Sequence, residues 1–492
     1  MESLSETKWD VVISGTGLQH SLLALALSRS DKKVLHVDQN EYYGGAEAAF
    51  SLQEVDEWVE KVNGDSSKPF RNASLWKAGA EHSIEASKLS FSRAYTLTLS
   101  PQIIYTKSNL LAQLVSSKVY RQLEFQAVGN WWVLDGEGGM ILKRLPNGRE
   151  DIFRDKSIDN RAKRSLMKFL KFVVDYENQP ETWHPHGDSG LSGFLSSQFQ
   201  LPLSLQTVIA ALTLSLEPSD VTPVKWALPR ISRHLSSLGV FGPGFGAVVP
   251  KWGGGAEISQ VACRAGAVGG GVYVLGTGVK TSAAESEDTE ARTRVHLSNE
   301  EVVTTQHLIE TSGEPLSNAK LVSKAIAVVS SPLNSLFKSS VEGSPLAAVS
   351  VVVIPPKTVT VESVPQSNPI YIMVHSSETG ECPNGQCVLY ATTLHSEQSK
   401  KLLDNALSTF LQSNQDHAEP LYTLYYDQEQ VRKNTTSEPS EASLDLAFND
   451  EVLEEVEAQW KAVVGDAEGA AFMRFEDREG MNDYDDEPNE DF

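Results

Sequence analysis

Residues 11–38 have the residue types and spacing of a dinucleotide-binding site. A short apolar run at residues 11–13 leads into Gly15-Thr16-Gly17, and Asp38 ends the next apolar run. In dinucleotide-binding proteins the glycines let the backbone approach a pyrophosphate, and an acid about 20 residues further on binds the ribose. Taken alone, the pattern favours FAD.

Two features of the same region oppose a bound nucleotide. His20 stands at the third glycine position, where only a hydrogen or a methyl group normally fits. Flavin enzymes of the amine-oxidase type usually continue Gly-Gly-Arg after the second strand. Here Ala46-Glu47 follows the double glycine and puts an acid near the phosphates. We therefore predict no cofactor and interpret the motif as a degenerate fingerprint, made up of Gly15, Gly17, His20 and Asp38.

Other candidates for chemistry are weaker. The histidines of the His184-Pro185-His186 loop suit a surface turn better than a metal site. Cys382 and Cys387 flank a Pro-Asn-Gly turn without two further ligands in view, and Cys263 lies in an apolar helical pattern. We predict no metal site and no catalytic set of residues.

A set of aromatic and charged residues indicates a protein interface instead. Tyr43, Trp252, Glu257 and Arg264 fall where a doubly wound sheet presents its binding edge. Glu257 and Arg264 are two turns apart on a presumed helix and therefore share one face. Aromatic and arginine side chains are enriched at interfaces. A core aromatic residue beside a surface ion pair is the alternative.

The elements that must position these residues follow strand and helix periods. Residues 9–45 read as strand, glycine turn, helix and strand, the first βαβ unit of a doubly wound sheet. Residues 150–230 change to a helical period. We predict an α/β fold of the FAD/NAD(P)-binding type, with residues 1–149 and 231–475 as the sheet domain and residues 150–230 as an inserted small all-helical domain. Residues 476–492 hold nine acids against one arginine, which predicts a disordered tail.

Composition narrows the class of protein. The net charge is −23, which argues against nucleic acid as a partner because phosphate binding needs a basic face. Three cysteines are too few for a disulfide framework and indicate a reducing compartment. The sequence shows no signal peptide and no apolar run of about 20 residues that would span a membrane. We expect a cytoplasmic protein.

Five stretches resemble the superfamily of Rab escort proteins and Rab GDP-dissociation inhibitors. Members of this superfamily are relatives of FAD amine oxidases that keep the fold without the flavin. The Gly-Thr-Gly-Leu turn with a bulky sixth residue is specific to the superfamily. The matching stretches, within roughly the first 275 residues, are DVVISGTGLQHSLLALALS, KKVLHVDQNEYYGG, VYRQLEFQAVGNWWV, RSLMKFLKFVVDY and SLGVFGPGFGAVVPKWGGGAEISQVACRAGAVGGGVYVL.

The resemblance implies a non-catalytic protein whose sheet domain forms a platform for a GDP-bound Rab GTPase. It assigns Tyr43, Glu257 and Arg264 to this platform, beside Trp252. Phe245 lies in the glycine-rich loop that matches the loop gripping the Rab switch region. The turn before Glu257 is one residue longer than is usual in the family, and Ser259 replaces a proline.

The resemblance also implies a role for the helical domain, which would accept geranylgeranyl chains and contact the Rab geranylgeranyltransferase. For this region we take the apolar face that RSLMKFLKFVVDY forms at helical spacing. Its residues are Leu166, Phe169, Leu170, Phe172 and Val173.

Three features favour the escort branch over the inhibitor branch: Phe50 after the double glycine, the segment 390–396, and the acidic tail. An escort protein holds newly made Rab·GDP and docks with it on the transferase αβ heterodimer, a zinc enzyme that prenylates the Rab C-terminus. It then delivers Rab to membranes, with which it associates transiently. The alternatives are an inhibitor that extracts and recycles prenylated Rab, and an amine-oxidase-like flavoenzyme.

Overall fold

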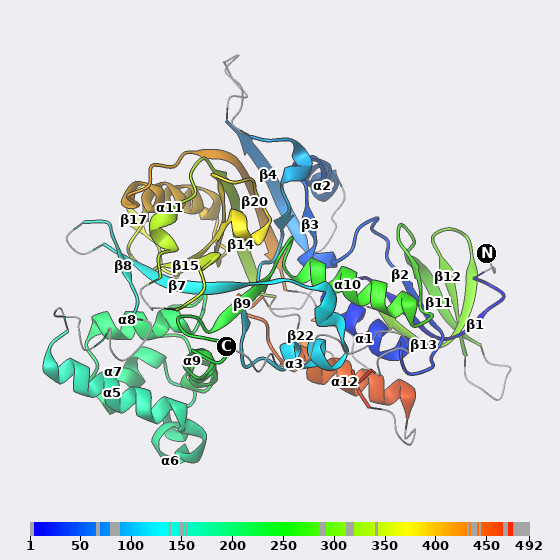
Figure 1. Cartoon of the computed structure of the whole chain (residues 1–492), viewed down its shortest axis with the longest axis horizontal. Coiled ribbons are helices and arrows are strands. Elements are labelled where there is room, and N and C mark those ends of the chain that lie inside the picture. The colour runs from blue at the N-terminus through cyan, green and yellow to red at the C-terminus, as the bar shows by residue number, and fades with distance from the viewer. Residues whose placement is uncertain are drawn as a thin grey trace, which may run out of the picture.

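The computed structural model describes residues 4–64, 69–78, 89–136, 139–146, 152, 156, 158–285, 292–310, 319–339, 343–430, 432–433, 440–441, 444–465 and 471–475. These residues form an α/β fold with two large sheets, and a group of helices lies at one end (Figure 1). The acidic segment 476–492 lies outside the described residues.

The six-stranded sheet contains the predicted βαβ unit. Strand β1 pairs in parallel with β2 and with β13, and β10 pairs in parallel with β2. Strands β11 and β12 extend the sheet in antiparallel fashion. The order is β10 (Val272–Val274), β2 (Val34–Val37), β1 (Lys8–Ser14), β13 (Val302–Glu310), β12 (Arg292–Leu297) and β11 (Val279–Glu285).

Helix α1 (Leu18–Ser28) connects β1 to β2 and is buried along almost its whole length. It packs against α10 (Gly255–Val268) and α12 (Glu451–Val464), which explains why its sequence is apolar on every side. The opposite face of β1 and β2 packs on β12. The glycine turn therefore stands on a rigid base.

The second sheet has ten strands and is antiparallel apart from the β7–β15 pair. One face packs on α11 (Ser399–Ser413) and the other on α2 (Leu52–Gly64). The order is β4 (Phe70–Lys77), β20 (Pro420–Glu429), β14 (Leu321–Val329), β19 (Cys387–Leu394), β18 (Ile370–Ser376), β15 (Val349–Ile354), β7 (Phe125–Asp135), β9 (Ala247–Pro250) and β6 (Ile104–Tyr105), with β8 (Ile141–Arg144) beside β7.

Five helices form a unit with a hydrophobic core of its own. Asp159 caps the first of them by accepting hydrogen bonds from the backbone N–H groups of Arg161 (2.7 Å) and Ala162 (2.9 Å). The last one continues to Ser237, so the predicted boundary at residue 230 falls inside a helix. The helices are α5 (Asn160–Val174), α6 (Pro180–Trp183), α7 (Leu191–Phe199), α8 (Leu203–Leu212) and α9 (Val224–Ser237).

The apolar face of α5 forms part of this core rather than an open lipid site. Leu166, Phe169, Phe172 and Val173 are buried, and Leu170 is partly buried against them. The Phe169 and Phe172 rings contact Phe199 of α7 at centroid distances of 5.2 and 5.1 Å. In this conformation the predicted lipid-contacting face is covered, because helical periodicity identifies an apolar face without showing what packs on it.

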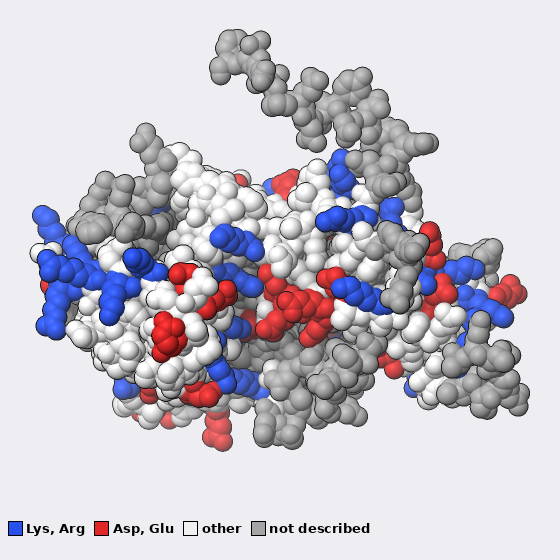
Figure 2. All heavy atoms as spheres, turned by 90° about the horizontal axis from the view of Figure 1, so that it is seen from below, with Lys and Arg blue, Asp and Glu red and all other residues white. Residues whose placement is uncertain are grey.

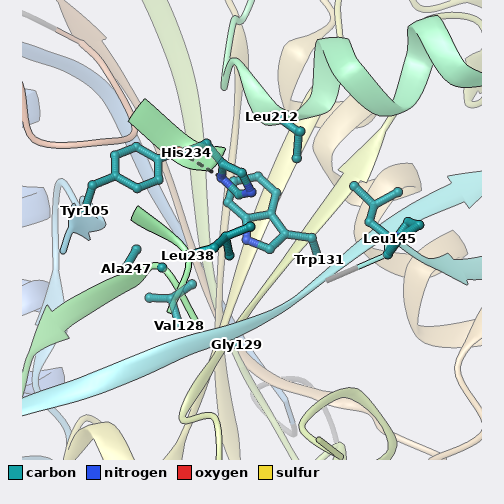
Figure 3. A pocket seen from close by; sticks show the side chains of 11 residues that line it. Tyr105, Val128, Gly129, Trp131, Leu145, Leu212, His234, Leu238 and Ala247 are labelled. Atoms are coloured by element: carbon teal, nitrogen blue, oxygen red, sulfur yellow. Dashed lines mark hydrogen bonds between the residues drawn. The ribbon is translucent and has the colours of Figure 1, made fainter. Parts of the chain in front are cut away.

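A small cavity of about 20 Å³ lies where the helical unit meets the ten-stranded sheet (Figure 3). His234 of α9 projects into this junction, edge-on to the ring of Trp131 at a centroid distance of 4.9 Å. Its Nδ1 is 3.4 Å from the hydroxyl of Tyr105. Burial lowers the pKa of His234 to about 4. The junction therefore holds a neutral imidazole at physiological pH.

We expect His234 to make the stability of this junction dependent on pH. Its pKa is about 6.5 in an unfolded chain and about 4 when folded, so only the unfolded chain binds this proton between those values. Stability therefore falls as the pH drops from 6.5 towards 4. Between pH 7.5 and pH 5 the His234 contribution to the free energy of unfolding should fall by about 2 kcal/mol.

Urea unfolding of wild type and His234→Gln at both pH values measures this difference. The variant should lose about 2 kcal/mol less than wild type between the two pH values. His184→Gln, which changes an exposed histidine of the same helical unit, is the matched control. Equal losses in wild type and His234→Gln would show that the pKa of His234 is the same in the folded and the unfolded protein.

Candidate functional site

Asp38 of the degenerate fingerprint is hydrogen-bonded to neighbouring residues of the chain. Asp38 is buried, and one of its carboxylate oxygens accepts hydrogen bonds from the backbone N–H and the hydroxyl of Thr16, both at 2.7 Å. The other oxygen accepts bonds from the backbone N–H (2.8 Å) and side-chain amide (3.0 Å) of Asn40. The backbone N–H of Gly44 closes the set by donating to the carbonyl of Thr16 at 3.1 Å. The predicted ribose-binding acid thus ties the glycine turn to the loop after β2.

A carboxylate of the chain lies where a pyrophosphate would approach helix α1. Gly17 is the N-cap of α1, and a Cβ placed on it would lie 3.5 Å from Oε2 of Glu47. Glu47 ends the short 3₁₀ turn η1 (Gly45–Glu47), which packs against Gly17. The N-terminus of a helix favours an anion, and here a side chain supplies one. A nucleotide phosphate would meet a like charge, so these residues do not fit FAD or a nicotinamide nucleotide.

Two histidines complete the surroundings of this turn. His20 is buried in the first turn of α1, at the position where dinucleotide-binding proteins have their third glycine. His36, which the sequence did not single out, has its Nε2 2.6 Å from the carbonyl oxygen of Gly15, and burial lowers its pKa to about 4. A neutral His36 therefore donates a hydrogen bond to the carbonyl oxygen of Gly15, which stabilises the glycine turn.

The structure brings three of the predicted interface residues together. The loop after β2 packs on the start of α10, where a Cβ on Gly44 would lie 3.2 Å from Cβ of Ala256. On α10, a guanidinium nitrogen of Arg264 lies 3.3 Å from Oε1 of Glu257. The side chain of Arg264 is 59% exposed, and that of Glu257 is 17% exposed.

The pKa shifts agree with this grouping. Burial raises the pKa of Glu257, and the guanidinium of Arg264 opposes that rise. Burial also raises the pKa of Tyr43, with the Cys263 thiol acting in the same direction and Arg264 against it. Tyr43, Glu257 and Arg264 thus form one partly exposed surface, which we call the platform cluster.

Trp252 lies beside this surface and is fixed in place. It is 43% exposed, its backbone N–H donates to the carbonyl of Thr379 at 2.8 Å, and its ring covers Gly380, where a Cβ would be 2.3 Å from Cδ1. The Lys251 ammonium lies 4.6 Å from the ring centroid. Trp252, Gly253 and Gly254 all have positive φ, which is how the longer turn before Glu257 is accommodated.

Phe245, predicted as part of a gripping loop, is a core residue. It is 7% exposed and packs with Leu110, Leu114 and Val119. The exposed members of the same loop are Val240 and Phe241, at 45% and 59%. Phe245 stands between two glycines and Phe241 between Val240 and Gly242, and this local difference does not show which ring is buried. The sequence held no signal that would have selected Phe241.

The remaining candidates form no site in the described residues. The three cysteines are buried and unpaired there, and Cys263 Sγ donates to the Ser21 hydroxyl at 3.5 Å. His184 and His186 belong to a short 3₁₀ turn, η5 (His184–His186). Within the described ranges, no group of three or more His, Cys, Asp or Glu side chains is arranged for a metal ion. In the same ranges, no helix is both long and apolar enough to cross a bilayer.

Fold and site together define a scaffold of the dinucleotide-binding type in which the chain's own carboxylate lies at the phosphate position. Residues 5–466 match the family model described as GDI, GDP dissociation inhibitor. The chain belongs to this family.

Two fungal proteins are similar in sequence to this chain over about four fifths of its length. "Rab proteins geranylgeranyltransferase component A" of Saccharomyces cerevisiae is 33% identical over 81% of this chain and 64% of its own length. The Candida albicans protein of the same name is 30% identical over 80% of this chain and 60% of its own. The chain thus spans less than two thirds of the length of either relative.

A solved structure supports the fold. The Rab GDI of Plasmodium falciparum superposes with a TM-score of 0.64 over 92% of this chain and 97% of that one. At 19% identity the likeness concerns the fold alone. The predicted α/β architecture of the FAD/NAD(P)-binding, GDI type is confirmed.

Proposed function

We propose that this protein is a Rab escort protein. It binds newly made, GDP-bound Rab GTPases and presents them to the Rab geranylgeranyltransferase αβ heterodimer for double prenylation. It then delivers them to membranes. The observation that carries the proposal is the similarity over four fifths of the chain to two fungal proteins named component A. The chain itself is an accessory component and transfers no lipid.

The geometry of the site supports a carrier rather than an enzyme. Glu47 puts a carboxylate where the phosphates of a flavin would approach α1, and the carboxylate of Asp38, which would bind the ribose, is bonded to Thr16 and Asn40 instead. Next to them, the platform cluster and Trp252 present aromatic rings and a guanidinium on a surface held by α10 and the loop after β2. Such residues are enriched at the energetic centres of protein interfaces.

A carrier of prenylated Rab also needs a place for geranylgeranyl chains, and we place it in the helical unit. Its core is apolar throughout α5, α7, α8 and α9, and a lipid would enter by separating helices that are packed in this conformation. Each buried methylene contributes about 0.8 kcal/mol, so a long isoprenoid chain provides enough free energy for such a rearrangement. We place the carrier in the cytoplasm, at membranes only during delivery.

Reconstituted prenylation tests the proposal. Unmodified Rab·GDP, the transferase αβ heterodimer and geranylgeranyl diphosphate are incubated with and without the purified chain, and the lipid added to Rab is measured by mass spectrometry. Two lipids should be added to Rab only in the presence of the chain, and more slowly when Rab carries a GTP analogue. Equal rates without the chain would refute the escort proposal.

The same protein preparation tests the two other functions. A GDP-dissociation inhibitor would not stimulate prenylation but would extract already prenylated Rab from membranes. A flavoenzyme would show flavin absorption bands in the visible spectrum of the purified protein. The sequence similarity to two proteins named component A favours the escort function over the inhibitor and the flavoenzyme.

A further inference from the structure

Helix α5 carries a row of cations on its solvent face. Arg161, Arg164, Lys168 and Lys171 are all exposed and are spaced three or four residues apart, so they lie along one side of the helix. We call them the basic row. Figure 2 shows Lys and Arg side chains gathered at the end of the molecule where the helical unit lies, on the left of that view.

Acidic side chains of the described residues leave most of this row unpaired, although Arg161 at its start interacts with the carboxylate of Asp159. No acid occurs between Arg161 and Lys171, although the chain has 65 acids against 42 cations. Within the described residues, Arg164, Lys168 and Lys171 form no ion pair with any carboxylate. Like charges at this spacing destabilise a helix by a few tenths of a kcal/mol per pair. The row is thus kept at a cost, in a protein that is otherwise acidic.

The row stands on a rigid support at the edge of the molecule. The opposite face of α5 is buried in the core of the helical unit, which fixes the direction in which the cations point. Lys168 lies 5.5 Å above the ring of Phe199. In Figure 1, α5 runs along the outer side of the helical unit, far from the six-stranded sheet. The row therefore lies at the outer edge of the molecule with its four side chains exposed.

We propose that the basic row of α5 is a docking surface for a lipid bilayer that carries anionic headgroups. The cations stand on long, flexible stems along a convex helix and line no pocket, which suits a fluid layer of phosphates better than one bound anion. The exposed Val174 follows Lys171 at the end of the helix and adds an apolar contact. Acids elsewhere in the chain oppose the attraction weakly, because charges more than about 8 Å away are screened at physiological salt.

This surface is separate from the platform cluster, and the inference does not rest on the proposed escort function. Among the described residues, no helix is long and apolar enough to cross a membrane. The basic row would let the chain bind to the surface of a membrane instead. Since no Rab is needed, the chain alone can be tested. Failure of the prenylation experiment and failure of this one can then be distinguished.

Vesicle flotation with the full chain tests the proposal. Vesicles of phosphatidylcholine with one third phosphatidylserine are compared with vesicles of phosphatidylcholine alone. Wild type should float with the anionic vesicles, and high salt should release it. The triple variant Arg164→Ala, Lys168→Ala, Lys171→Ala should bind on the order of 100-fold more weakly, since each cation near an anionic surface contributes about a fivefold factor.

The matched control makes the same change in net charge elsewhere. It combines Lys77→Ala, Lys280→Ala and Lys401→Ala, three exposed cations that pair with Asp56, Glu300 and Glu362. The control should float like wild type, and circular dichroism should show all three proteins folded.

Three outcomes would overturn the proposal. One is that wild type does not bind the anionic vesicles at low salt. Another is that the control loses as much binding as the α5 variant. The third is that the α5 variant keeps its vesicle binding but loses affinity for the transferase αβ heterodimer, which would assign the basic row to a protein partner.

Discussion

Replacing Arg264 by glutamate should weaken binding of Rab·GDP at least 100-fold while leaving the protein folded. The guanidinium is mostly exposed, and its pair with Glu257 spans 3.3 Å at the surface. An exposed ion pair of this kind contributes about 0–1 kcal/mol to stability. Reversing the charge of a residue at the centre of an interface costs several kcal/mol of binding free energy, because the partner group is left facing a like charge.

The structure gives this substitution a second effect in the same direction. Arg264 opposes the rise in the pKa of Glu257 that burial causes, so a glutamate at position 264 would raise that pKa further. The platform cluster would change from a balanced pair to two acids beside Tyr43. Affinity is measured by titrating the variant against fluorescent Rab·GDP, and stability by urea unfolding.

Lys280→Glu is the matched control for Arg264→Glu. Lys280 also forms an exposed ion pair, with Glu300. It lies on β11, the edge strand of the six-stranded sheet opposite β10. Its reversal should change neither affinity nor folding beyond a factor of two or three. If Arg264→Glu binds Rab·GDP like wild type, α10 does not form the platform. If the variant unfolds, the Arg264–Glu257 pair is structural instead.

Removing the carboxylate of Asp38 should lower the free energy of unfolding by about 3–5 kcal/mol. Its two oxygens accept four hydrogen bonds from Thr16 and Asn40, and the side chain is buried. In Asp38→Ala the backbone N–H groups of both residues would lose their acceptor inside the protein. Buried donors left without an acceptor account for most of the expected loss.

Urea unfolding of Asp38→Ala against Glu41→Ala measures this effect. Glu41 is an exposed acid of the same loop, so its removal should cost less than about 1 kcal/mol. A change at Asp38 no larger than that at Glu41 would contradict a structural role. In a nucleotide site the same substitution would weaken cofactor binding with little loss of stability, so the two roles predict opposite results.

The sequence predicted the first βαβ unit and the helical unit because their apolar periods are strong. Most positions that the sheet and α1 bury within residues 9–37 are apolar, with His20 and His36 among the exceptions, and residues 160–174 follow a helical period. Helix α12 carried the same kind of signal, with Leu453, Val456, Trp460 and Val463 at helical spacing. We did not predict α12, although it packs on α1 beside α10.

The arrangement of the sheets depended on long-range pairing. Strands β13 and β14 are neighbours in sequence, yet one pairs with β1 in the six-stranded sheet and the other with β19 and β20 in the ten-stranded sheet. A period of two residues predicts a strand and its buried face but says nothing about its partner. The sequence of this region therefore does not show to which sheet each strand belongs.

Glycines, apolar periods and a resemblance over roughly the first 275 residues can be read in order along the chain, so they were enough to predict the class of scaffold and the family. The sequence also showed that His20 and Glu47 are foreign to a nucleotide site. The direction of each side chain, in contrast, depends on tertiary packing. This packing put Glu47 over the start of α1, used Asp38 inside the protein, and buried Phe245 while exposing Phe241. These outcomes depend on which distant elements pack together, and no local pattern in the sequence specifies that packing.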